Sequence, residues 1–179
     1  LNFSTVWLGW AFDRLQSTYK PSPDDIAAWA NRTGLFGDGR LLADGLAAWA
    51  AEDHMKALHV LVPQIEAAFR MLVGRLGRPT TKAHPQMRQA RMVVTMGEVL
   101  FHEETPVALG KNGADLVLHF RTLYADPRGH NLRNDIAHGI LPYEAFGAGN
   151  ALWVIHSLLL LGAWLKPIDT SNDSARSTS

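Results

Sequence analysis

No cysteine occurs among the 179 residues of this chain. Its absence excludes a disulfide framework, a cysteine nucleophile and cysteine-ligated metal sites, and it is compatible with a reducing compartment such as the cytosol. A net charge is lacking too, because 17 basic residues balance 17 acidic ones. Hydrophobic residues make up 47% of the chain, which is typical of a globular protein with a real core and excludes a disordered one.

Long apolar runs are also missing. The longest, ALWVIHSLLLLGAWL at residues 151–165, includes His156 and is too short to span a bilayer comfortably, so we interpret it as a buried core helix. We expect a cytoplasmic protein with no membrane partner. The chain begins at Leu1 and not at a methionine, from which we expect it to be a piece of a longer protein or a processed form.

Strand patterns and internal repeats are absent, whereas apolar residues recur every three to four positions along most of the chain. The sequence therefore predicts an all-α fold, an antiparallel bundle of about six or seven helices. Pro63 falls inside the longest of them, where it predicts a kink or a break. The expected helices cover residues 4–19, 23–31, 41–51, 52–76, 93–101, 114–124 and 143–165.

Three parts are predicted along the chain. Residues 1–38 form an N-terminal helical arm or the remnant of a preceding domain, residues 39–167 form the helical domain, and residues 168–179 form a disordered tail. Within the arm, Ser22 is a candidate N-cap for a helix that begins at Pro23 and has two aspartates in its first turn.

Acidic residues are missing from one long stretch, Ala67–Gly97, which carries six basic ones. Its middle, Gly77–Gln89, is rich in Pro, Thr and Lys and is predicted to be a loop. Two interpretations remain open, a solvated surface and a local phosphate-binding patch. The candidate RNA-binding residues are Arg75, Arg78, Lys82, Arg88 and Arg91, together with His130 further along the chain.

The segment Asn131–Gly139, NLRNDIAHG, gathers an arginine, two amides, a carboxylate and an imidazole in nine residues. On a helix, Asn134 and His138 share one side, which we expect to be free for chemistry. The long side chain of Arg133 can swing its guanidinium towards the imidazole. The nearly opposite side is apolar and is expected to pack; it carries Leu132, Ile136 and Ile140.

Arg133-Asn134, three further residues and His138 resemble the signature of HEPN domains, an Arg followed by a polar residue and then, after a short spacing, a His. Two longer strings, GHNLRNDIAHG at residues 129–139 and LVPQIE at residues 61–66, resemble a bacterial domain family whose C-terminal part is HEPN-like. The resemblance covers roughly residues 40–166.

This resemblance implies a HEPN-like helical bundle that forms a homodimer, with the two Arg/His motifs facing one another across a cleft. It implies metal-independent endoribonuclease activity without a cofactor, on RNA such as single-stranded RNA or tRNA, in a toxin–antitoxin or phage-defence system with an antitoxin or sensor domain as partner. Other members keep the fold without catalysis, so the alternative is a non-catalytic nucleotide-binding, partner-binding or dimerisation module of a larger protein. Ile140 stands where some HEPN toxins carry a modified Tyr, so the resemblance does not extend to that mode of neutralisation.

The catalytic residues implied are Arg133, Asn134 and His138. An imidazole both takes and gives a proton near neutral pH, as cleavage of RNA through its own 2′-hydroxyl requires, and His138 from each of two chains supplies such a pair. The planar guanidinium of Arg133 suits the negative charge that gathers on the phosphate oxygens. Asn134 is expected to orient His138 or the phosphate.

Four further residues are expected to support the site. Glu66 and Arg70 lie four apart on the longest predicted helix. They form either a modest surface ion pair or a support in which Glu66 reaches across to position Arg133. Asn131 flanks the motif, and Asp135 is expected to point elsewhere and pair with an arginine.

Neither a metal site nor a base-stacking platform is predicted. His102, Glu103 and Glu104 are adjacent, and adjacent side chains on a helix do not converge on one ion. Histidines other than His138 are expected in core or surface roles, with His130 as the exception because it flanks the motif. The tryptophans are expected to pack in the core; they are Trp7, Trp10, Trp29, Trp49, Trp153 and Trp164.

Overall fold

The computed structural model describes residues 3–164, so the predicted disordered tail at 168–179 lies outside the described residues. The all-α prediction is confirmed: this part of the chain contains nine α-helices and one two-stranded sheet. The helix count exceeds six or seven because two short helices, α6 and α8, add to the seven ranges expected from the sequence. The elements are α1 (Phe3–Tyr19), α2 (Pro23–Asn31), α3 (Arg40–Ala50), α4 (His54–Arg75), β1 (Thr81–Ala83), β2 (Arg91–Val93), α5 (Met96–Leu100), α6 (Thr105–Ala108), α7 (Gly113–Tyr124), α8 (Leu132–Ala137), the 3-10 helix η1 (Tyr143–Ala145) and α9 (Ala148–Trp164).

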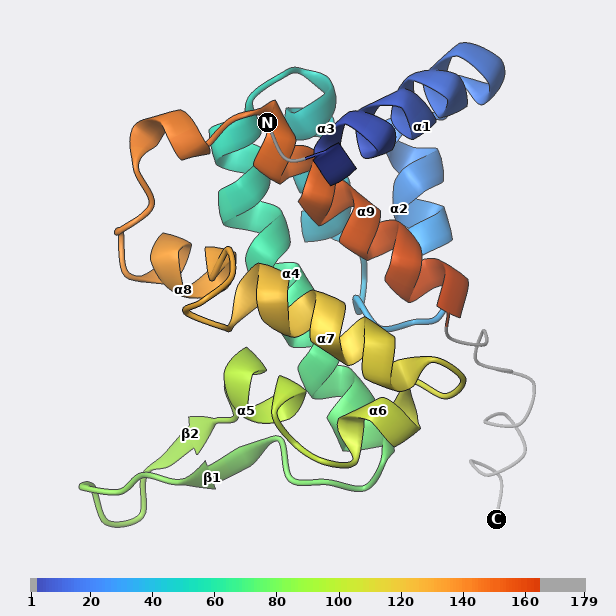
Figure 1. The fold of residues 1–179 in the computed structure, drawn as a ribbon. Helices are drawn as coiled ribbons and strands as arrows, with labels where there is room; N and C mark the ends of the chain where they lie inside the picture. Colours follow the sequence, from blue (N-terminus) through green and yellow to red (C-terminus); the bar gives the residue numbers. More distant parts are fainter. Residues whose placement is uncertain (1–2, 165–179) are drawn as a thin grey trace.

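Helix α4 is the centre of the bundle. It contacts α3, α5, α6, α8 and α9, and Figure 1 shows α7 crossing in front of it. Gly45 of α3 lets the first pair approach closely, since a Cβ there would lie 2.5 Å from Leu61 of α4. At the other end, Phe69 of α4 meets Phe120 of α7 edge to face with ring centroids 4.9 Å apart. The buried stripe of α4 consists of Ala57, Leu58, Leu61, Val62, Ile65, Glu66, Ala68, Phe69 and Leu72.

The N-terminal residues share this core. Phe12 of α1 and Ile26 of α2 belong to the same buried cluster as the residues of α4, and both helices contact α9. The predicted start of α2 is confirmed: the Ser22 hydroxyl accepts from the backbone N–H of Asp25, the Asp25 carboxylate accepts in return from the Ser22 N–H, and Pro23 opens the helix. No separate core marks off residues 1–38 within the described part.

Two expectations about regular structure were wrong. The expected break at Pro63 does not occur, since α4 runs unbroken through this residue and its neighbours pack against both halves of the helix. The segment predicted as a loop with no strands contains an antiparallel hairpin, in which Lys82 pairs with Met92, and Val93, predicted to be helical, lies in β2. Three-residue strands are too short to show an alternation in sequence. The hairpin projects at the lower left of Figure 1.

The tryptophans are less buried than predicted. Trp7, Trp10 and Trp29 are exposed, Trp49 and Trp153 are half-buried, and the side chain of Trp164 lies outside the described part. Only α4, among the residues that the structure describes, is long and apolar enough to cross a membrane by length and composition.

Candidate functional site

Helix α8 is short and begins at a strained residue. Asn131 adopts the left-handed conformation, with φ 48° and ψ 25°, which asparagine tolerates better than most residues. Its side-chain Nδ2 donates to Oδ1 of Asp135 at 2.8 Å, and its Oδ1 accepts from Nδ2 of Asn134 at 2.7 Å. Leu132 is buried beneath them. The two amides and the carboxylate therefore hold one another in place, and Asp135 bonds to an asparagine and not to the arginine that was predicted.

Glu66 is the hub that joins this helix to α4. Its side chain is 10% exposed, and it lies in the apolar stripe of α4. Oε2 accepts from Nε of Arg133 at 2.8 Å, and Oε1 accepts from Nη2 of Arg133 at 3.1 Å, from Nη1 of Arg70 at 3.0 Å and from the backbone N–H of Met96 at 3.1 Å. A buried carboxylate needs such partners, and here two guanidinium groups and a backbone N–H supply them.

This geometry decides between the two interpretations of Glu66. The carboxylate is not a surface ion-pair partner of Arg70 alone, since it also fixes Arg133 through two hydrogen bonds, 67 residues away in sequence. The guanidinium of Arg133 donates in addition from Nη1 to Oδ1 of Asn134 at 3.0 Å. Three of its five N–H groups are thus engaged, and two make no hydrogen bond within the described part of the chain. Hydrogen bonds and ion pairs link six side chains here, which we name the Glu66 network: Glu66, Arg70, Arg133, Asn134, Asn131 and Asp135.

His138 stands apart from the Glu66 network. It is the residue that ends α8, its backbone N–H donates to the carbonyl oxygen of Asn134 at 2.9 Å, and its side chain is exposed. The imidazole makes no hydrogen bond to any residue of the described chain. Glu66 and Asn134 hold the guanidinium of Arg133, and no hydrogen bond joins it to His138 among the described residues.

The packed side of the motif is also shorter than predicted. Leu132 is buried and Ile136 packs against the core, but Ile140 is 66% exposed. The helix ends at Ala137, and Gly139 follows with a φ of 65°, so the chain turns away before Ile140.

The loop before α8 is fixed by a local ion pair. The Asp126 carboxylate accepts from the backbone N–H and the Nε of Arg128 through Oδ1, and from Nη2 through Oδ2 at 2.8 Å. These hydrogen bonds from Arg128 lower the pKa of Asp126 to about 2. Next to it, Gly129 lies so close to α7 that a Cβ would be 2.1 Å from the carbonyl oxygen of Thr122. The end of α7 and the start of α8 are therefore locked together.

Several basic candidates of the segment 67–97 bind other parts of the protein. Arg75 donates from Nη1 to the carbonyl oxygen of Thr33 at 2.9 Å and from Nη2 to that of Gly34 at 2.6 Å. Burial of this guanidinium lowers the pKa of Arg75. Arg75 thus ties the end of α4 to the loop between α2 and α3.

The basic residues near the hairpin are paired in a similar way. Arg78 forms an ion pair with Glu104, and Lys82 forms one with Glu98, whose pKa is lowered chiefly by the hydrogen bond from Lys82. Such exposed pairs contribute little stability but neutralise the charges.

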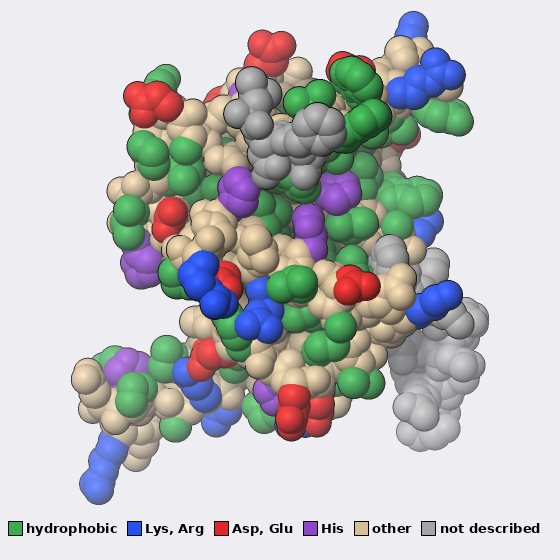
Figure 2. Space-filling model, in the orientation of Figure 1, with side chains coloured by type: hydrophobic (Ala, Val, Ile, Leu, Met, Phe, Trp, Pro, Cys, Tyr) green, Lys and Arg blue, Asp and Glu red, His purple; other side chains and the backbone are tan. Residues whose placement is uncertain are grey.

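Two arginines of the hairpin keep a free positive charge. Arg91 donates to the hydroxyl and carbonyl oxygens of Thr81, which are neutral groups, at 2.9 and 3.1 Å. Arg88 is exposed and has no partner within residues 3–164. Figure 2 shows Lys and Arg side chains along the projecting hairpin of β1 and β2. A phosphate-binding patch, if it forms, thus rests on these two arginines more than on Arg75, Arg78 and Lys82.

Sequence reasoning missed a second polar cluster, between α7 and α9. The rings of His119, Trp153 and His156 lie 5.5–5.9 Å apart, and we name these residues the His119 cluster. Burial lowers the pKa of His119, and burial followed by the charge of His119 lowers the pKa of His156 to about 4. Nε2 of His119 and Nδ1 of His156 are buried without a hydrogen-bond partner in the described structure. The sequence offered one sign of this cluster, the imidazole of His156 inside the apolar run 151–165.

Histidines gather on the face over α7 and α9 in Figure 2, yet no group there or elsewhere in residues 3–164 has three His, Asp or Glu side chains placed to hold a metal ion. The three adjacent residues His102, Glu103 and Glu104 do not converge on one ion. Glu104 is paired with Arg78, and Nδ1 of His102 accepts from the backbone N–H of Glu104 at 3.2 Å.

Comparison with protein-family models, with curated protein sequences and with solved structures found no match to this chain. The likeness to HEPN domains therefore stays a prediction. The arrangement of side chains around Arg133 and His138 is what supports a function.

Proposed function

We propose that this chain is a metal-independent endoribonuclease of HEPN type, a cytoplasmic toxin or phage-defence enzyme that acts on single-stranded RNA or tRNA. The observation that carries the proposal is the orientation of Arg133 by Glu66, two hydrogen bonds at 2.8 and 3.1 Å from a carboxylate that is 10% exposed. A guanidinium held this firmly, with two N–H groups left over, is suited to hold a phosphate without reorganising.

The exposed imidazole of His138 supplies the proton transfers. As general base it takes the proton of the ribose 2′-hydroxyl while the 2′-oxygen attacks phosphorus. A second imidazole, protonated, gives its proton to the departing 5′-oxygen, so that the products are a 2′,3′-cyclic phosphate and a free 5′-hydroxyl. Arg133 neutralises the charge that gathers on the non-bridging oxygens meanwhile.

One chain offers one His138, so this chemistry needs a second copy. The exposed position of His138 at the end of α8, with no internal hydrogen bond among the described residues, leaves the ring available to meet its counterpart. We therefore propose that the active form is a homodimer with both rings at one cleft.

The decisive experiment is cleavage of tRNA and of a single-stranded RNA by the purified chain in EDTA. The His138→Ala variant should lose activity by about 10²–10⁴-fold, the usual contribution of general acid–base catalysis. Because this side chain is exposed and makes no internal hydrogen bond, the variant should fold normally. The matched control is His102→Ala, which replaces another exposed histidine and should keep full activity.

Arg133→Ala should also abolish cleavage, but it removes the partner of buried Glu66 and therefore needs a folding check by circular dichroism. Cleavage that requires a divalent metal, or that survives His138→Ala, would contradict the proposal.

A specific observation favours the non-catalytic alternative, a nucleotide-binding or partner-binding module. Glu66 and Asn134 engage three of the five N–H groups of Arg133, which is also how a purely structural arginine is held. Saturable binding of nucleotide or RNA with no product under any condition, in a dimer confirmed by light scattering, would select this alternative.

A further inference from the structure

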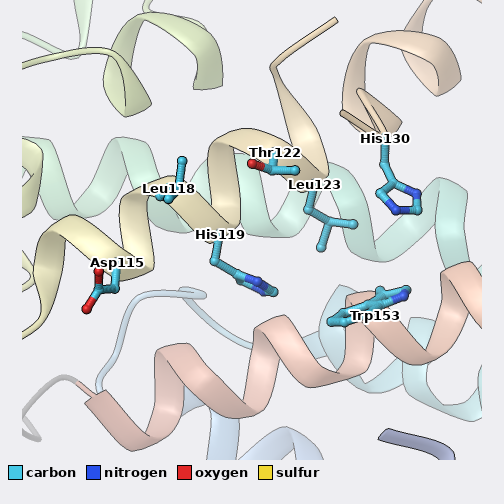
Figure 3. A pocket seen from close by; sticks show the side chains of 7 residues that line it. All are labelled: Asp115, Leu118, His119, Thr122, Leu123, His130 and Trp153. Atoms are coloured by element: carbon cyan, nitrogen blue, oxygen red, sulfur yellow. The ribbon is translucent and has the colours of Figure 1, made fainter. Parts of the chain in front are cut away.

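A cavity of about 320 Å³ opens between α7 and α9, beside the start of α8. Figure 3 shows His119 on α7, Trp153 on α9 and His130 before α8 with their rings directed into this space. The volume lies at the low end of the range for ligand pockets, roughly 300–1,000 Å³, and fits a small ring system. The lining residues are Asp115, Leu118, His119, Thr122, Leu123, His130 and Trp153.

The walls offer aromatic faces. The indole of Trp153 forms one side, held by a hydrogen bond from its Nε1 to the hydroxyl of Thr5 at 3.3 Å. The imidazole of His119 lies 5.9 Å from it between ring centroids. Aromatic walls of this kind bind a flat π-system by stacking, whereas an aliphatic ligand gains less from them.

The polar groups at this site are few and mostly neutral. Thr122 and His130 lie at one end, and Asp115 lies at the other. His119 carries a ring nitrogen, Nε2, that is buried with no partner in the described part of the chain, and its lowered pKa keeps the ring uncharged at neutral pH. The surroundings thus suit an uncharged ring with hydrogen-bonding edges inside the cavity, and the lone carboxylate disfavours an anionic group within it, so the phosphate of a nucleotide stays outside.

The cavity is joined directly to the segment Asn131–Gly139 through the backbone. The backbone N–H of His130 donates to the carbonyl oxygen of Thr122 at 2.8 Å, and Gly129 packs on the same carbonyl. Asn131, the first residue of the Glu66 network, comes next along the chain. A ring stacked on Trp153 in this cavity therefore lies beside the segment that leads directly into the Glu66 network.

We propose that this cavity binds a nucleobase, with Trp153 as the stacking wall and His119, Thr122 and His130 at its edges. The binding itself is independent of catalysis, while its role in seating an RNA base beside the cleaved phosphate rests on the proposed function. The base comes from an RNA strand or from a free mononucleotide, and the two sources are separated by experiment.

The test measures binding of AMP, GMP, CMP and UMP to the full chain by calorimetry and by the NMR shift of the Trp153 indole. Ribose 5-phosphate, which has no base, is the ligand control. At least one nucleotide should saturate and shift the indole, and ribose 5-phosphate should do neither. A single-stranded RNA that binds more tightly than its own mononucleotide assigns the site to a strand; equal affinities assign it to the free nucleotide.

Filling the cavity provides the matched variant. Thr122→Trp should weaken base binding at least about tenfold, since stacking of one base is worth about 1–3 kcal/mol. Thr18→Trp replaces another exposed helical threonine, on α1 and outside the cavity, and should bind like the wild type. His130→Ala, which changes the rim without adding bulk, should weaken binding in the same direction.

The inference is overturned if nucleotides and ribose 5-phosphate bind alike, if no nucleotide or RNA saturates, or if Thr122→Trp binds as the wild type does. These results are distinct from a failure of the proposed nuclease. A wild type that binds bases through this cavity but never cleaves RNA leaves the inference standing and removes the nuclease. Cleavage that depends on His138, with base binding insensitive to Thr122→Trp, leaves the nuclease standing and removes the inference.

Discussion

This bundle contains two polar clusters that are built in opposite ways: the Glu66 network joins α4 and α8, and the His119 cluster lies between α7 and α9. In the Glu66 network every carboxylate has donors, from guanidinium groups, side-chain amides and a backbone N–H. In the His119 cluster two imidazoles are half-buried, their pKa values are lowered by burial, and a nitrogen of each lacks a partner among the described residues.

The difference teaches what each cluster can do. A network in which every carboxylate has donors is rigid, so it holds Arg133 in one orientation. An unsatisfied buried nitrogen costs about 1–3 kcal/mol, and a ligand that supplies the missing hydrogen bond recovers part of that cost. The first cluster is thus a positioning device, and the second has the character of a binding cavity.

The largest expected effect comes from breaking the saturated cluster. Glu66→Ala leaves Arg133 and Arg70 half-buried without their carboxylate and should lower the free energy of unfolding by about 3–5 kcal/mol. Urea denaturation followed by circular dichroism measures the change. The control, Glu104→Ala, removes an exposed carboxylate that pairs with Arg78 and should cost less than about 1 kcal/mol. Equal losses in the two variants would show that Glu66 is not a hub.

An intermediate effect is expected where the clusters are joined. Gly129→Ala places a Cβ 2.1 Å from the carbonyl oxygen of Thr122, so α7 and the start of α8 must move apart. The cost should be about 1–3 kcal/mol, as in other overpacked sites, read from the thermal midpoint. Gly97→Ala in α5 meets nothing closer than 4.0 Å and should be neutral or slightly stabilising. A Gly129→Ala protein as stable as the wild type would mean that the junction is not tight.

The smallest effect is pH-dependent and belongs to the His119 cluster. The pKa of His156 falls from 6.5 to about 4 on folding, so below pH 6.5 the unfolded chain binds a proton that the folded chain refuses. His156 therefore lowers the free energy of unfolding progressively as the pH falls from about 6.5 to 4. The loss is about 1–2 kcal/mol after allowance for partial solvent screening.

His156→Leu should remove this fall, so that its stability relative to the wild type rises as the pH drops through that window. Urea midpoints at pH 7, 6, 5 and 4 give the comparison. The control, His59→Leu, removes an exposed histidine of α4 outside the His119 cluster, and the relative gain at low pH should be specific to His156→Leu. Parallel curves for His156→Leu and the wild type would refute the assignment of a buried, neutral imidazole.

Local patterns predicted much of the fold, and sequence-distant contacts account for what they missed. The start of α2 at Ser22 and Pro23 and the extent of α3 and α4 follow from caps and apolar spacing, which act within a few residues. The hairpin at Thr81 and the early end of α8 do not, because three-residue strands and a six-residue helix carry too little periodicity.

The candidate site, too, was predicted in its local residues and not in its long-range contacts. Arg133, Asn134 and His138 could be named from one short segment, and Glu66 could be suspected because it is a carboxylate in an apolar stripe. The direction of Arg133 could not be predicted, since it depends on a partner 67 residues away. Nor could the cavity at His119, which exists only because α7 and α9 meet at a particular distance.

The sequence by itself determined that this chain is helical, globular and free of cysteine chemistry, and which residues carry the titratable and cationic groups. Composition and periodicity suffice for that, because they act through local propensity and burial. Only the tertiary structure decided that Glu66 turns Arg133 towards α4, that His138 stays exposed, and that His119 meets Trp153 across a cavity. Hydrogen bonds and ring contacts act over a few ångströms, and folding alone brings such distant residues that close.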